Sequence, residues 1–338
     1  MMSGTSLDGL DMALCEFNEV DSKIKFDLIA SETIHYTNEW KDRLKNISKE
    51  TAEHYFKLHT EYGIFIGENI NHFLRKHKQT AHYIASHGHT IFHQPKLGFT
   101  TQIGCGATIS AKTTISTICD FRSMDVALGG QGAPLVPIGD RDLFAQSDSC
   151  LNIGGIANIS FTKDNITFAF DICIANMALN YLCELIKKPY DDGGLMASSG
   201  TINENILSQL LNLKTNHQSL GREWFETFMQ PILDTFIISI EDKLATCVEY
   251  CAIQISNSLN TNALKSVLIT GGGVYNHFLI AQLKKLYHGK IEIPSNDIIQ
   301  FKEAIIFAYL GYLKINDKPN ALCSVTKAKR DSIGGCIY

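Results

Sequence analysis

The segment that most constrains the fold of this chain is a glycine-containing run at its start, residues 2–11, which reads MSGTSLDGLD and leads directly into the strand-like residues 12–17. Glycine lets a backbone turn so tightly that successive N–H groups point at one anion. Thr5 and Ser6 add hydroxyl donors, and Asp8 is suited to hold a water on a magnesium ion that bridges phosphates. The run is not a Walker loop, because no G-x-x-x-x-G-K-[ST] pattern occurs and no helix follows. Taken alone, an ordinary glycine-containing hairpin turn is the alternative.

Two later loops share this character. Residues 152–158 (NIGGIAN) lie between the strand-like segments 149–151 and 159–161. Residues 270–276 (TGGGVYN) follow the β-branched run 266–269 and lead into a predicted helix at 277–283. Three glycine turns at strand ends suit a nucleotide whose phosphates rest on backbone donors. Three unrelated tight turns remain the alternative, because a doubly wound fold needs several of them.

Composition narrows the class of protein. A chain of 338 residues is too long for one simple core, so two lobes are expected. With 45% hydrophobic and 19% charged residues it has ample apolar side chains to bury, and its net charge of -5 argues against binding nucleic acid through phosphate neutralisation. No apolar run reaches the length of a membrane span and no signal-peptide pattern opens the chain, so we expect a cytoplasmic protein without a membrane anchor.

The ten cysteines are scattered and include no C-x-x-C pair. Cys247 and Cys251 are spaced to share a helix face, and buried free thiols explain them better than a disulfide does. No disulfide is predicted.

The remaining pattern alternates strands and helices. Strands are predicted at 24–35, 82–86, 113–120 and within 150–170, and the glycine- and proline-rich residues 129–137 (GGQGAPLVP) are interpreted as a loop that crosses between the lobes. Helical periodicity covers 38–77, where Phe56, Ile66, Ile70 and Phe73 are candidate core positions, and returns at 176–186, 202–211, 244–259 and 301–313. This alternation predicts an α/β protein with two lobes around a glycine-rich cleft.

A reaction at such a cleft needs a base, and Asp171 is the best-placed carboxylate. It ends the apolar segment 166–170 and precedes a helix that is predicted to start near Asn176. A carboxylate at the carboxyl end of a strand, beside a partly dry cleft, can take a proton from water or a hydroxyl group. A turn or helix-capping aspartate is the alternative. Other acids compete with it: Asp120, Asp125, Asp191, Asp192 and Glu303.

Three histidines near residue 90 raise the question of a metal site. His87 and His89 would share a strand face, with His93 close by and Asp120 joining from elsewhere. Catalytic zinc normally has a clearer ligand set, such as a helical H-E-x-x-H, so a loop that contacts substrate is the preferred interpretation.

Several motifs, in order along nearly the whole chain, resemble the anhydro-N-acetylmuramic acid kinase family. They are MSGTSLDG at 2–9, SHGHT at 86–90, DFR at 120–122, GGQGAPLVP at 129–137, LNIGG at 151–155 and GGG at 271–273. The GGQGAPLVP string is the most specific of them. The resemblance implies a two-lobed sugar kinase/Hsp70/actin-like (ribonuclease H-like) fold with the active site between the lobes. By this resemblance, 1–120 with about 315–338 form the N-terminal lobe and 121–314 the C-terminal lobe.

The resemblance also implies a reaction. Members of the family use ATP and Mg²⁺ to open the 1,6-anhydro ring of anhydro-N-acetylmuramic acid with water while phosphorylating O6, which gives N-acetylmuramic acid 6-phosphate. Asp171 matches the family's base, and a homodimer is expected by analogy. Sugar-side positions are matched by His87, Arg122, Arg222 and Glu303. Nucleotide positions are matched by Gly4, Thr5, Ser6, Leu7, Asp8 (also the metal position), Gly9, Leu10, Asp11, Asn152, Gly154, Gly155, Gly271, Gly272, Gly273 and Asn276.

The chain departs from the family pattern at three places. Residues 172–176 read ICIAN where many relatives have Gly-Pro-Gly-Asn, His89 replaces a glutamine, and relatives have a short strand before Met-Ser-Gly. The first change removes backbone freedom beside the base, and the loss of a first strand is expected to weaken the anchoring of the phosphate loop. The alternative function is therefore a catalytically impaired sugar- or nucleotide-binding regulator on the same fold. A dehydrogenase is less consistent, because no G-x-G-x-x-G follows an opening strand.

Overall fold

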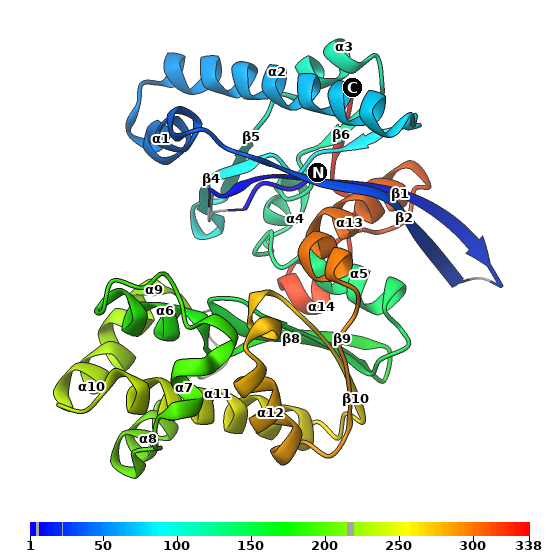
Figure 1. Ribbon diagram of the computed structural model, residues 1–338. Coiled ribbons are helices and arrows are strands. Elements are labelled where there is room, and N and C mark those ends of the chain that lie inside the picture. The colour runs from blue at the N-terminus through cyan, green and yellow to red at the C-terminus, as the bar shows by residue number, and fades with distance from the viewer. Residues whose placement is uncertain (5–6, 22, 215–219) are drawn as a thin grey trace. The chain divides into compact units, whose positions relative to one another are not determined.

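The structure is a computed structural model that describes residues 1–4, 7–21, 23–214 and 220–338 (Figure 1). The described chain divides into two compact units. Unit 1 comprises Met1–Leu143 with Phe301–Tyr338, and unit 2 comprises Phe144–Gln300. The lobe limits expected from the resemblance, 1–120 with about 315–338 and 121–314, fall at other positions and stay a prediction.

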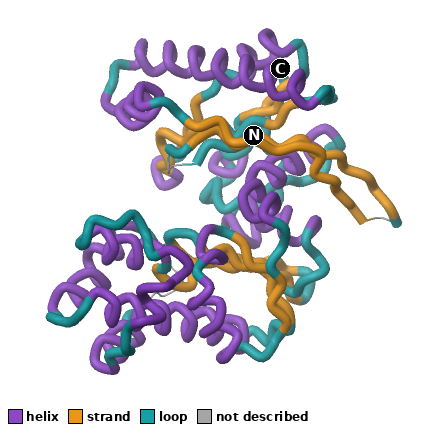
Figure 2. Tube along the Cα trace, viewed as in Figure 1, coloured by secondary structure: helices purple, strands orange, loops and turns teal. Residues whose placement is uncertain are grey.

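Unit 1 combines short sheets with helices, as the tube in Figure 2 shows by colour. Its elements, in chain order, are β1 (Gly9–Val20), β2 (Lys23–His35), α1 (Asn38–Asn46), η1 (Ile47–Lys49), α2 (Ala52–His77), β3 (Ile84–Ala85), β4 (His89–Gln94), η2 (Pro95–Leu97), β5 (Phe99–Ile103), α3 (Gly106–Thr113), β6 (Thr117–Cys119), α4 (Ser123–Ala127), α5 (Val136–Leu143), the part of α13 (Asn296–Ile315) from Phe301 onward, α14 (Cys323–Thr326) and β12 (Cys336–Ile337). The η elements are single 3-10 turns in this unit.

The strands of unit 1 form three separate ladders. β1 pairs antiparallel with β2, β4 pairs with β5, and β6 lies between β12 and β3. The predicted strand at 24–35 is confirmed as β2. The strands predicted at 82–86 and 113–120 are each shorter than expected, since Thr113 still belongs to α3 and only Thr117–Cys119 forms β6.

The predicted helical stretch 38–77 contains two helices rather than one. Thr37 and Thr51 cap α1 and α2, each accepting a hydrogen bond at its hydroxyl from the amide three residues on, at 3.3 Å. Ile66, Ile70 and Phe73 are buried as predicted, but the prediction for Phe56 was wrong, because its side chain is 66% exposed. Phe56 lies two positions, or about 200°, around the helix from the buried Leu58, so it faces away from the core.

The GGQGAPLVP segment also differs from its interpretation. It lies inside unit 1 and not at a crossing, because the chain passes into unit 2 between Leu143 and Phe144. Its last two residues are helical, since Val136 begins α5 and Pro137 occupies the first turn, where the missing N–H has no partner to lose.

Unit 2 is built on a five-stranded mixed sheet. Its elements are β7 (Ser149–Ile153), β8 (Ile156–Lys163), β9 (Ile166–Ile174), α6 (Asn176–Glu184), η3 (Asp192–Gly194), α7 (Leu195–Ser199), α8 (Glu204–Leu211), α9 (Arg222–Trp224), the π-helical turn η4 (Phe225–Met229), α10 (Gln230–Thr235), α11 (Ile240–Thr261), β10 (Ser266–Thr270), η5 (Gly272–Tyr275), α12 (His277–Leu286), β11 (Lys290–Glu292) and the first turn of α13.

The strand order in unit 2 is β11-β10-β7-β8-β9. β7, β8 and β9 form an antiparallel meander, whereas β10 and β11 run parallel to β7. A meander of three strands extended on its first edge by two parallel strands is the order of a ribonuclease H-like sheet. The strand order therefore agrees with the fold that the resemblance implied.

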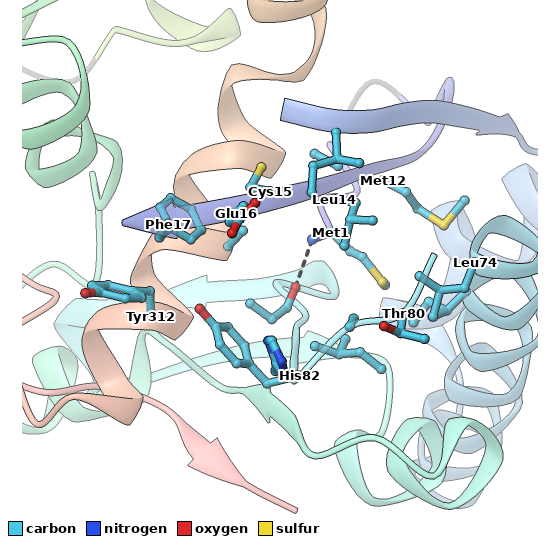
Figure 3. A pocket seen from close by; sticks show the side chains of 18 of the residues that line it. Met1, Met12, Leu14, Cys15, Glu16, Phe17, Leu74, Thr80, His82 and Tyr312 are labelled. Carbon is cyan, nitrogen blue, oxygen red and sulfur yellow. Dashed lines mark hydrogen bonds between the residues drawn. The ribbon is translucent and has the colours of Figure 1, made fainter. Parts of the chain in front are cut away.

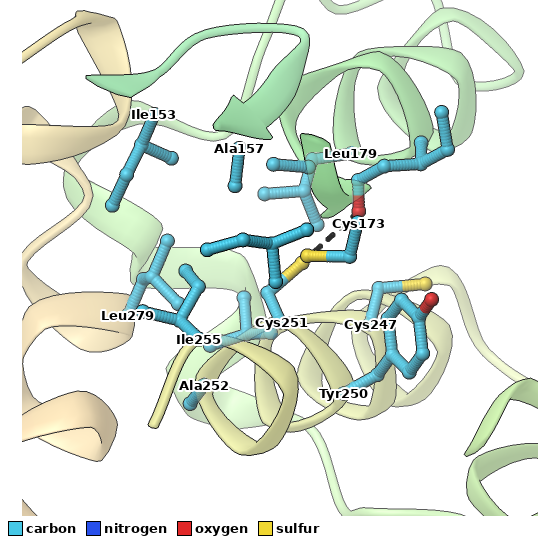
Figure 4. Close-up of a cluster of buried hydrophobic side chains, with 14 of the residues drawn as sticks. Ile153, Ala157, Cys173, Leu179, Cys247, Tyr250, Cys251, Ala252, Ile255 and Leu279 are labelled. Atoms are coloured by element: carbon cyan, nitrogen blue, oxygen red, sulfur yellow. Dashed lines mark hydrogen bonds between the residues drawn. The ribbon is translucent and has the colours of Figure 1, made fainter. Parts of the chain in front are cut away.

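The core of unit 2 lies where α11 and α6 meet the sheet (Figure 4). Cys247 and Cys251 are buried on one side of α11, and the Cys251 thiol donates to the carbonyl of Ile174 at 3.3 Å. All ten cysteines are free, so the prediction of no disulfide is confirmed.

Unit 1 holds a cavity of about 510 Å³ between β1 and the segment that leads into β3 (Figure 3). The amino group of Met1 is buried beside it and donates to the carbonyl of Ala85 at 2.8 Å. None of the predicted site residues lines this cavity. Across the described residues, no helix has both the length and the apolar character that a membrane crossing requires.

Candidate functional site

The described residues of the first glycine run, 2–4 and 7–11, are held in unit 1 by backbone pairing of its two ends. The backbone N–H and C=O of Met2 exchange hydrogen bonds with those of Asp11 at 2.9 and 2.8 Å, so the run folds back on β1. Leu7 adopts a left-handed conformation, with φ 57°, and its N–H donates to Gly4. Gly9 has room for no side chain, because a Cβ there would lie 2.7 Å from the carbonyl oxygen of Ile34. The expected nucleotide positions Thr5 and Ser6 fall outside the described residues.

Two carboxylates accompany this turn. Burial raises the pKa of Asp11, the hydrogen bond from Thr33 Oγ1 at 2.6 Å opposes the rise, and the nearby charge of Asp8 adds to it. The carboxylates of Asp8 and Asp11 therefore lie within each other's field, and hard oxygen ligands of this kind suit Mg²⁺. Leu10 differs from its neighbours, because its side chain is buried in the core of unit 1.

The sugar-side residues predicted in unit 1 meet around one aromatic ring. Arg122 Nε donates to His87 Nε2 at 3.0 Å, and the Nδ1 of His87 lies 2.9 Å from the carbonyl oxygen of Gly88. His87 is therefore the neutral Nδ1–H tautomer, donating to Gly88 and accepting from Arg122. Burial, together with the charge of Arg122, holds the pKa of His87 well below its usual range. Both side chains lie against Phe307 of α13.

Arg122 links this pair to a charged neighbour on α13. Burial lowers the pKa of Arg122 to about 10, and the carboxylates of Glu303 and Asp125 oppose that lowering. Glu303 is exposed. The structure thus brings together His87, Arg122 and Glu303, three residues that were 35 and 181 positions apart in the sequence.

The GGQGAPLVP loop is folded around Asp125, which the sequence placed only among competing acids. Asp125 is fully buried, and its two carboxylate oxygens accept from Gly132 N at 2.7 Å and from Thr326 Oγ1 at 2.6 Å. Arg122 Nη1 donates to the carbonyl of Gly132 at 2.6 Å. Asp125 is therefore an anchor for the loop that adjoins Arg122. The sequence signal was its position seven residues before Gly132, which by itself carried no such assignment.

Two of the other competing acids, Asp120 and Asp191, also have structural partners. Asp120 Oδ1 accepts from the hydroxyl of Ser123 at 2.5 Å, and the carboxylate of Asp191 accepts from the amides of Met196 and Ala197 at 2.8 and 2.9 Å. Among the described residues no group of three or more His, Cys, Asp or Glu side chains is placed to hold a metal ion, and this includes the histidines near residue 90.

The second glycine loop connects β7 to β8 in unit 2. The carbonyls of Gly154 and Gly155 accept from the amides of Asn176, Ala175 and Met177 at 2.9–3.2 Å. This turn therefore fixes the start of α6 by satisfying its first N–H groups. Ile172, Cys173 and Ile174, which depart from the glycine-rich family pattern, continue β9 and are buried in the core.

The third glycine loop packs directly on the second. Gly271 has φ +85°, and a Cβ there would lie 2.6 Å from Asn152 Oδ1, while a Cβ on Gly273 would overlap Ile153. A Cβ on Gly272, in contrast, would find its nearest neighbour 4.0 Å away. Asn276 caps α12 by accepting from Leu279 N at 2.9 Å. Gly271 and Gly273 thus pack directly on the end of β7 at Asn152 and Ile153.

Asp171 lies on the same sheet, opposite Asn158 of β8. The prediction that it ends its strand was wrong, because β9 continues through the apolar residues after it to Ile174. Ile172 is an extra residue at a bulge in the β8–β9 pairing, and bulges are common where a side chain is redirected next to a functional site.

The carboxyl of Asp171 accepts a hydrogen bond at Oδ2 from the amide of Leu220, at 2.8 Å. Burial raises the pKa of Asp171, and this hydrogen bond opposes the rise. Arg222 follows two residues later at the start of α9, with its side chain 81% exposed and its Nη1 4.0 Å from Glu226 Oε1. The role of Leu220 as a donor to Asp171 has no residue-type signal in the sequence, because Leu220 contributes only a backbone N–H.

Comparison with known proteins gives matches along the full length of the chain. A family model described as anhydro-N-acetylmuramic acid kinase matches residues 1–338. The anhydro-N-acetylmuramic acid kinases of Mannheimia succiniciproducens and Coxiella burnetii are 34% and 35% identical to the chain, each over 100% of it and over 97% and 96% of the relative. That of Sulfurimonas denitrificans is 31% identical over 100% of this chain and 98% of its own.

Similarity to solved structures is more distant. A ROK hexokinase from Thermus thermophilus, 9% identical over 89% of this chain and 100% of its own, gives a TM-score of 0.39. The fold assignment therefore depends on the strand order of unit 2 and on the full-length family match. On that match, the chain belongs to the anhydro-N-acetylmuramic acid kinase family.

Proposed function

We propose that this chain is an ATP-dependent sugar kinase that opens the 1,6-anhydro ring of anhydro-N-acetylmuramic acid with water and phosphorylates O6, giving N-acetylmuramic acid 6-phosphate. The observation that carries the proposal is the family match over residues 1–338 in a chain that retains Asp171. Its products would be ADP and the sugar phosphate, so one water and one ATP are consumed in each turnover.

Asp171 is the proposed base. Its carboxylate would take a proton from the water that attacks the anomeric carbon, while O6 leaves that carbon and accepts the phosphoryl group. A carboxyl whose pKa is raised by burial is a better proton acceptor than an exposed aspartate. The Leu220 amide supports this role because it holds the carboxyl of Asp171 through Oδ2.

The glycine loops are the proposed nucleotide contacts. We assign the phosphates to the run from Gly4 to Asp11 and to Asn152, Gly154 and Gly155, and the adenosine to 271–273 and Asn276. Asp8, with Asp11 beside it, would hold Mg²⁺. Bound there, the ion would neutralise charge on the phosphates. The absence of a ready three-ligand cage among the described residues is compatible with Mg²⁺, which is often bound by one or two carboxylates and by substrate phosphates.

The sugar contacts are proposed at His87, Arg122, Glu303 and Arg222. The first three support each other in unit 1, because the neutral His87 ring and the Glu303 carboxylate both bear on the Arg122 guanidinium. A homodimer and a cytoplasmic location, both expected from the sequence, stay predictions.

Direct assay tests the proposal. The purified chain is incubated with ATP, Mg²⁺ and anhydro-N-acetylmuramic acid, and ADP and sugar phosphate are followed together. We expect them to form in equal amounts, and N-acetylmuramic acid, whose ring is already open, serves as the control acceptor. The impaired-regulator alternative predicts sugar binding by calorimetry without ADP, and that result would overturn the assignment as an enzyme.

A further inference from the structure

A chain of buried hydroxyl groups runs from the first glycine loop into the core of unit 1. His89 Nδ1 lies 2.9 Å from Ser3 Oγ, which lies 2.7 Å from the hydroxyl of Tyr36. That hydroxyl lies 2.5 Å from the hydroxyl of Tyr62, on α2. All four residues are at least 95% buried. The family motifs that identified the chain include Ser3 and His89 but give no role to either tyrosine.

Tyr36 holds the glycine loop at both of its ends. Its hydroxyl bonds to Ser3, immediately before Gly4, and its backbone N–H donates to the carbonyl of Asp8 at 3.4 Å. The ring of His35 adds a second contact to the same carbonyl, with Nδ1 at 3.2 Å. Ser3 and Asp8, which lie on either side of residues 4–7, are therefore both held by Tyr36, and His35 at the end of β2 adds a contact to Asp8.

The hydroxyl chain is a hydrogen-bonding feature and not only a packing feature. Burial raises the pKa of Tyr62 well above its usual range and lowers that of His89 to about 4, so at neutral pH both side chains are uncharged. Each buried hydroxyl would be costly without a partner, and a chain of neutral donors and acceptors satisfies all of them. The rings of Tyr36 and Tyr62 also pack on Phe65 at centroid distances of 6.0 Å. A phenylalanine can keep this packing and lose only the hydrogen bond.

We propose that Tyr36 and Tyr62 are positioning residues for the phosphates of the nucleotide, acting through their contacts at Ser3 and at the carbonyl of Asp8. Neither tyrosine touches the nucleotide in this proposal. Phosphoryl transfer depends on how well the phosphates are placed, so loosening one end of the loop weakens nucleotide use without changing sugar recognition. This inference rests on the proposed function, because it assigns the loop to ATP.

The central test is Tyr62→Phe in the full chain, with Tyr250→Phe as the matched control. Tyr250 is a fully buried tyrosine of unit 2 whose hydroxyl has no hydrogen-bond partner within the described structure, so the control also deletes one buried hydroxyl. For Tyr62→Phe we expect KM for ATP to rise about threefold to tenfold, the range of one lost hydrogen bond, with KM for the anhydro sugar within about twofold of wild type on the same reasoning. Tyr250→Phe should leave both constants unchanged. Unchanged KM for ATP in a folded Tyr62→Phe protein, or an equal rise in both KM values, would overturn the proposal.

His89 provides a second pair of variants. His89→Gln keeps a side chain that can hydrogen-bond to Ser3, whereas His89→Leu removes it, so KM for ATP should stay near the wild-type value in the first and rise in the second. Equal values in the two variants would contradict a hydrogen-bonding role. Binding of a non-hydrolysable ATP analogue, measured by calorimetry on wild type, Tyr62→Phe and the two His89 variants, separates the positioning role of the tyrosines from the proposed kinase function. If wild type binds the analogue but turns over no sugar, the proposed function fails, and a weaker Kd in Tyr62→Phe still supports the positioning role.

Discussion

The two units hold their glycine loops by different means. In unit 1 buried side chains bond to the start of the loop, with Ser3 bonded to Tyr36 and His89, and these bonds add to the backbone pairing of Met2 with Asp11. In unit 2 the loops are fixed by backbone and by close packing, since the carbonyls of Gly154 and Gly155 satisfy the start of α6, and Gly271 and Gly273 lie against β7 where no Cβ fits.

This difference predicts which substitutions each unit tolerates. A loop held by hydroxyl groups is sensitive to the loss of a hydrogen bond and tolerates a conservative partner. A loop whose glycines pack closely against a neighbouring strand is sensitive to a single added methyl group, because there is no space for a Cβ. The two units also differ in how a titratable side chain is held. In unit 1 the buried, neutral His89 bonds to the hydroxyl of Ser3, whereas in unit 2 Asp171 accepts from a backbone amide.

Asp171→Asn is expected to have the largest effect. The amide oxygen of asparagine can still accept from Leu220 N, so the local structure of unit 2 should persist while the proton acceptor is lost. We expect turnover to fall by about a thousandfold or more, the range for removal of a catalytic base, with the Kd of the ATP analogue unchanged. In wild type, kcat should decrease as the pH falls through the pKa of Asp171, which burial places above that of an ordinary aspartate. Residual turnover near the wild-type rate would show that the base lies elsewhere.

Gly273→Ala should have the next largest effect and tests the packing side of the comparison. Its new Cβ would overlap Ile153 of β7, and overpacking of this kind costs about 1–3 kcal/mol of the free energy of unfolding. Gly272→Ala is the matched control, because the nearest atom to its Cβ would be 4.0 Å away. Urea unfolding of both variants gives the difference. If both lost the same stability, loop flexibility and not close packing would be the role of these glycines.

Acid pH should destabilise the chain through the histidine of unit 1. His89 is buried with its pKa lowered to about 4, whereas an unfolded histidine titrates near 6.5. Between these values the unfolded chain binds a proton that the folded chain does not, so the free energy of unfolding falls as the pH drops below about 6.5. For this one group the loss reaches about 2 kcal/mol at pH 5. His89→Gln should reduce the dependence of Tm on pH between 6.5 and 5, and an unchanged dependence would contradict the assignment.

The sequence predicted the parts of this structure that depend on local pattern. In unit 2 the strands β7 to β10 and the helices α6, α8, α11 and α12 were predictable from alternation and helical period, whereas the short elements α7, α9, α10 and β11 were not predicted. The absence of disulfides was predictable from the cysteine spacing. The error at Asp171 had a local cause, since the apolar ICI that follows was interpreted as leaving the strand when it continues into the core. The prediction that Phe56 is a core residue was wrong because a helical pattern does not show which apolar face of a helix packs against the rest of the protein.

The parts that could not be predicted depend on contacts between distant residues. Tyr62 reaches the glycine loop only because α2 passes over β2, and nothing near residue 62 signals a partner at Ser3. The pairing of Asp125 with Thr326 joins positions 201 residues apart. A backbone donor such as Leu220 N has no residue-type signature at all. Long-range hydrogen bonds of this kind decide how a site is oriented, and they follow from the fold rather than from a motif.

The smallest effect on stability is expected for Arg222→Ala. This variant extends the comparison of the units to the two arginines assigned to the sugar, Arg222 in unit 2 and Arg122 in unit 1. Arg222 is 81% exposed and 4.0 Å from Glu226, so its loss should change the free energy of unfolding by less than about 0.5 kcal/mol, as for other surface ion pairs. Arg122, which bonds to His87 and to the carbonyl of Gly132, is the structural counterpart. Because the exposed Arg222 side chain contributes little to stability, a change in KM for the sugar in Arg222→Ala reports a contact between Arg222 and the sugar. A chain with unchanged stability and unchanged KM would remove Arg222 from the sugar site and leave recognition to the residues of unit 1.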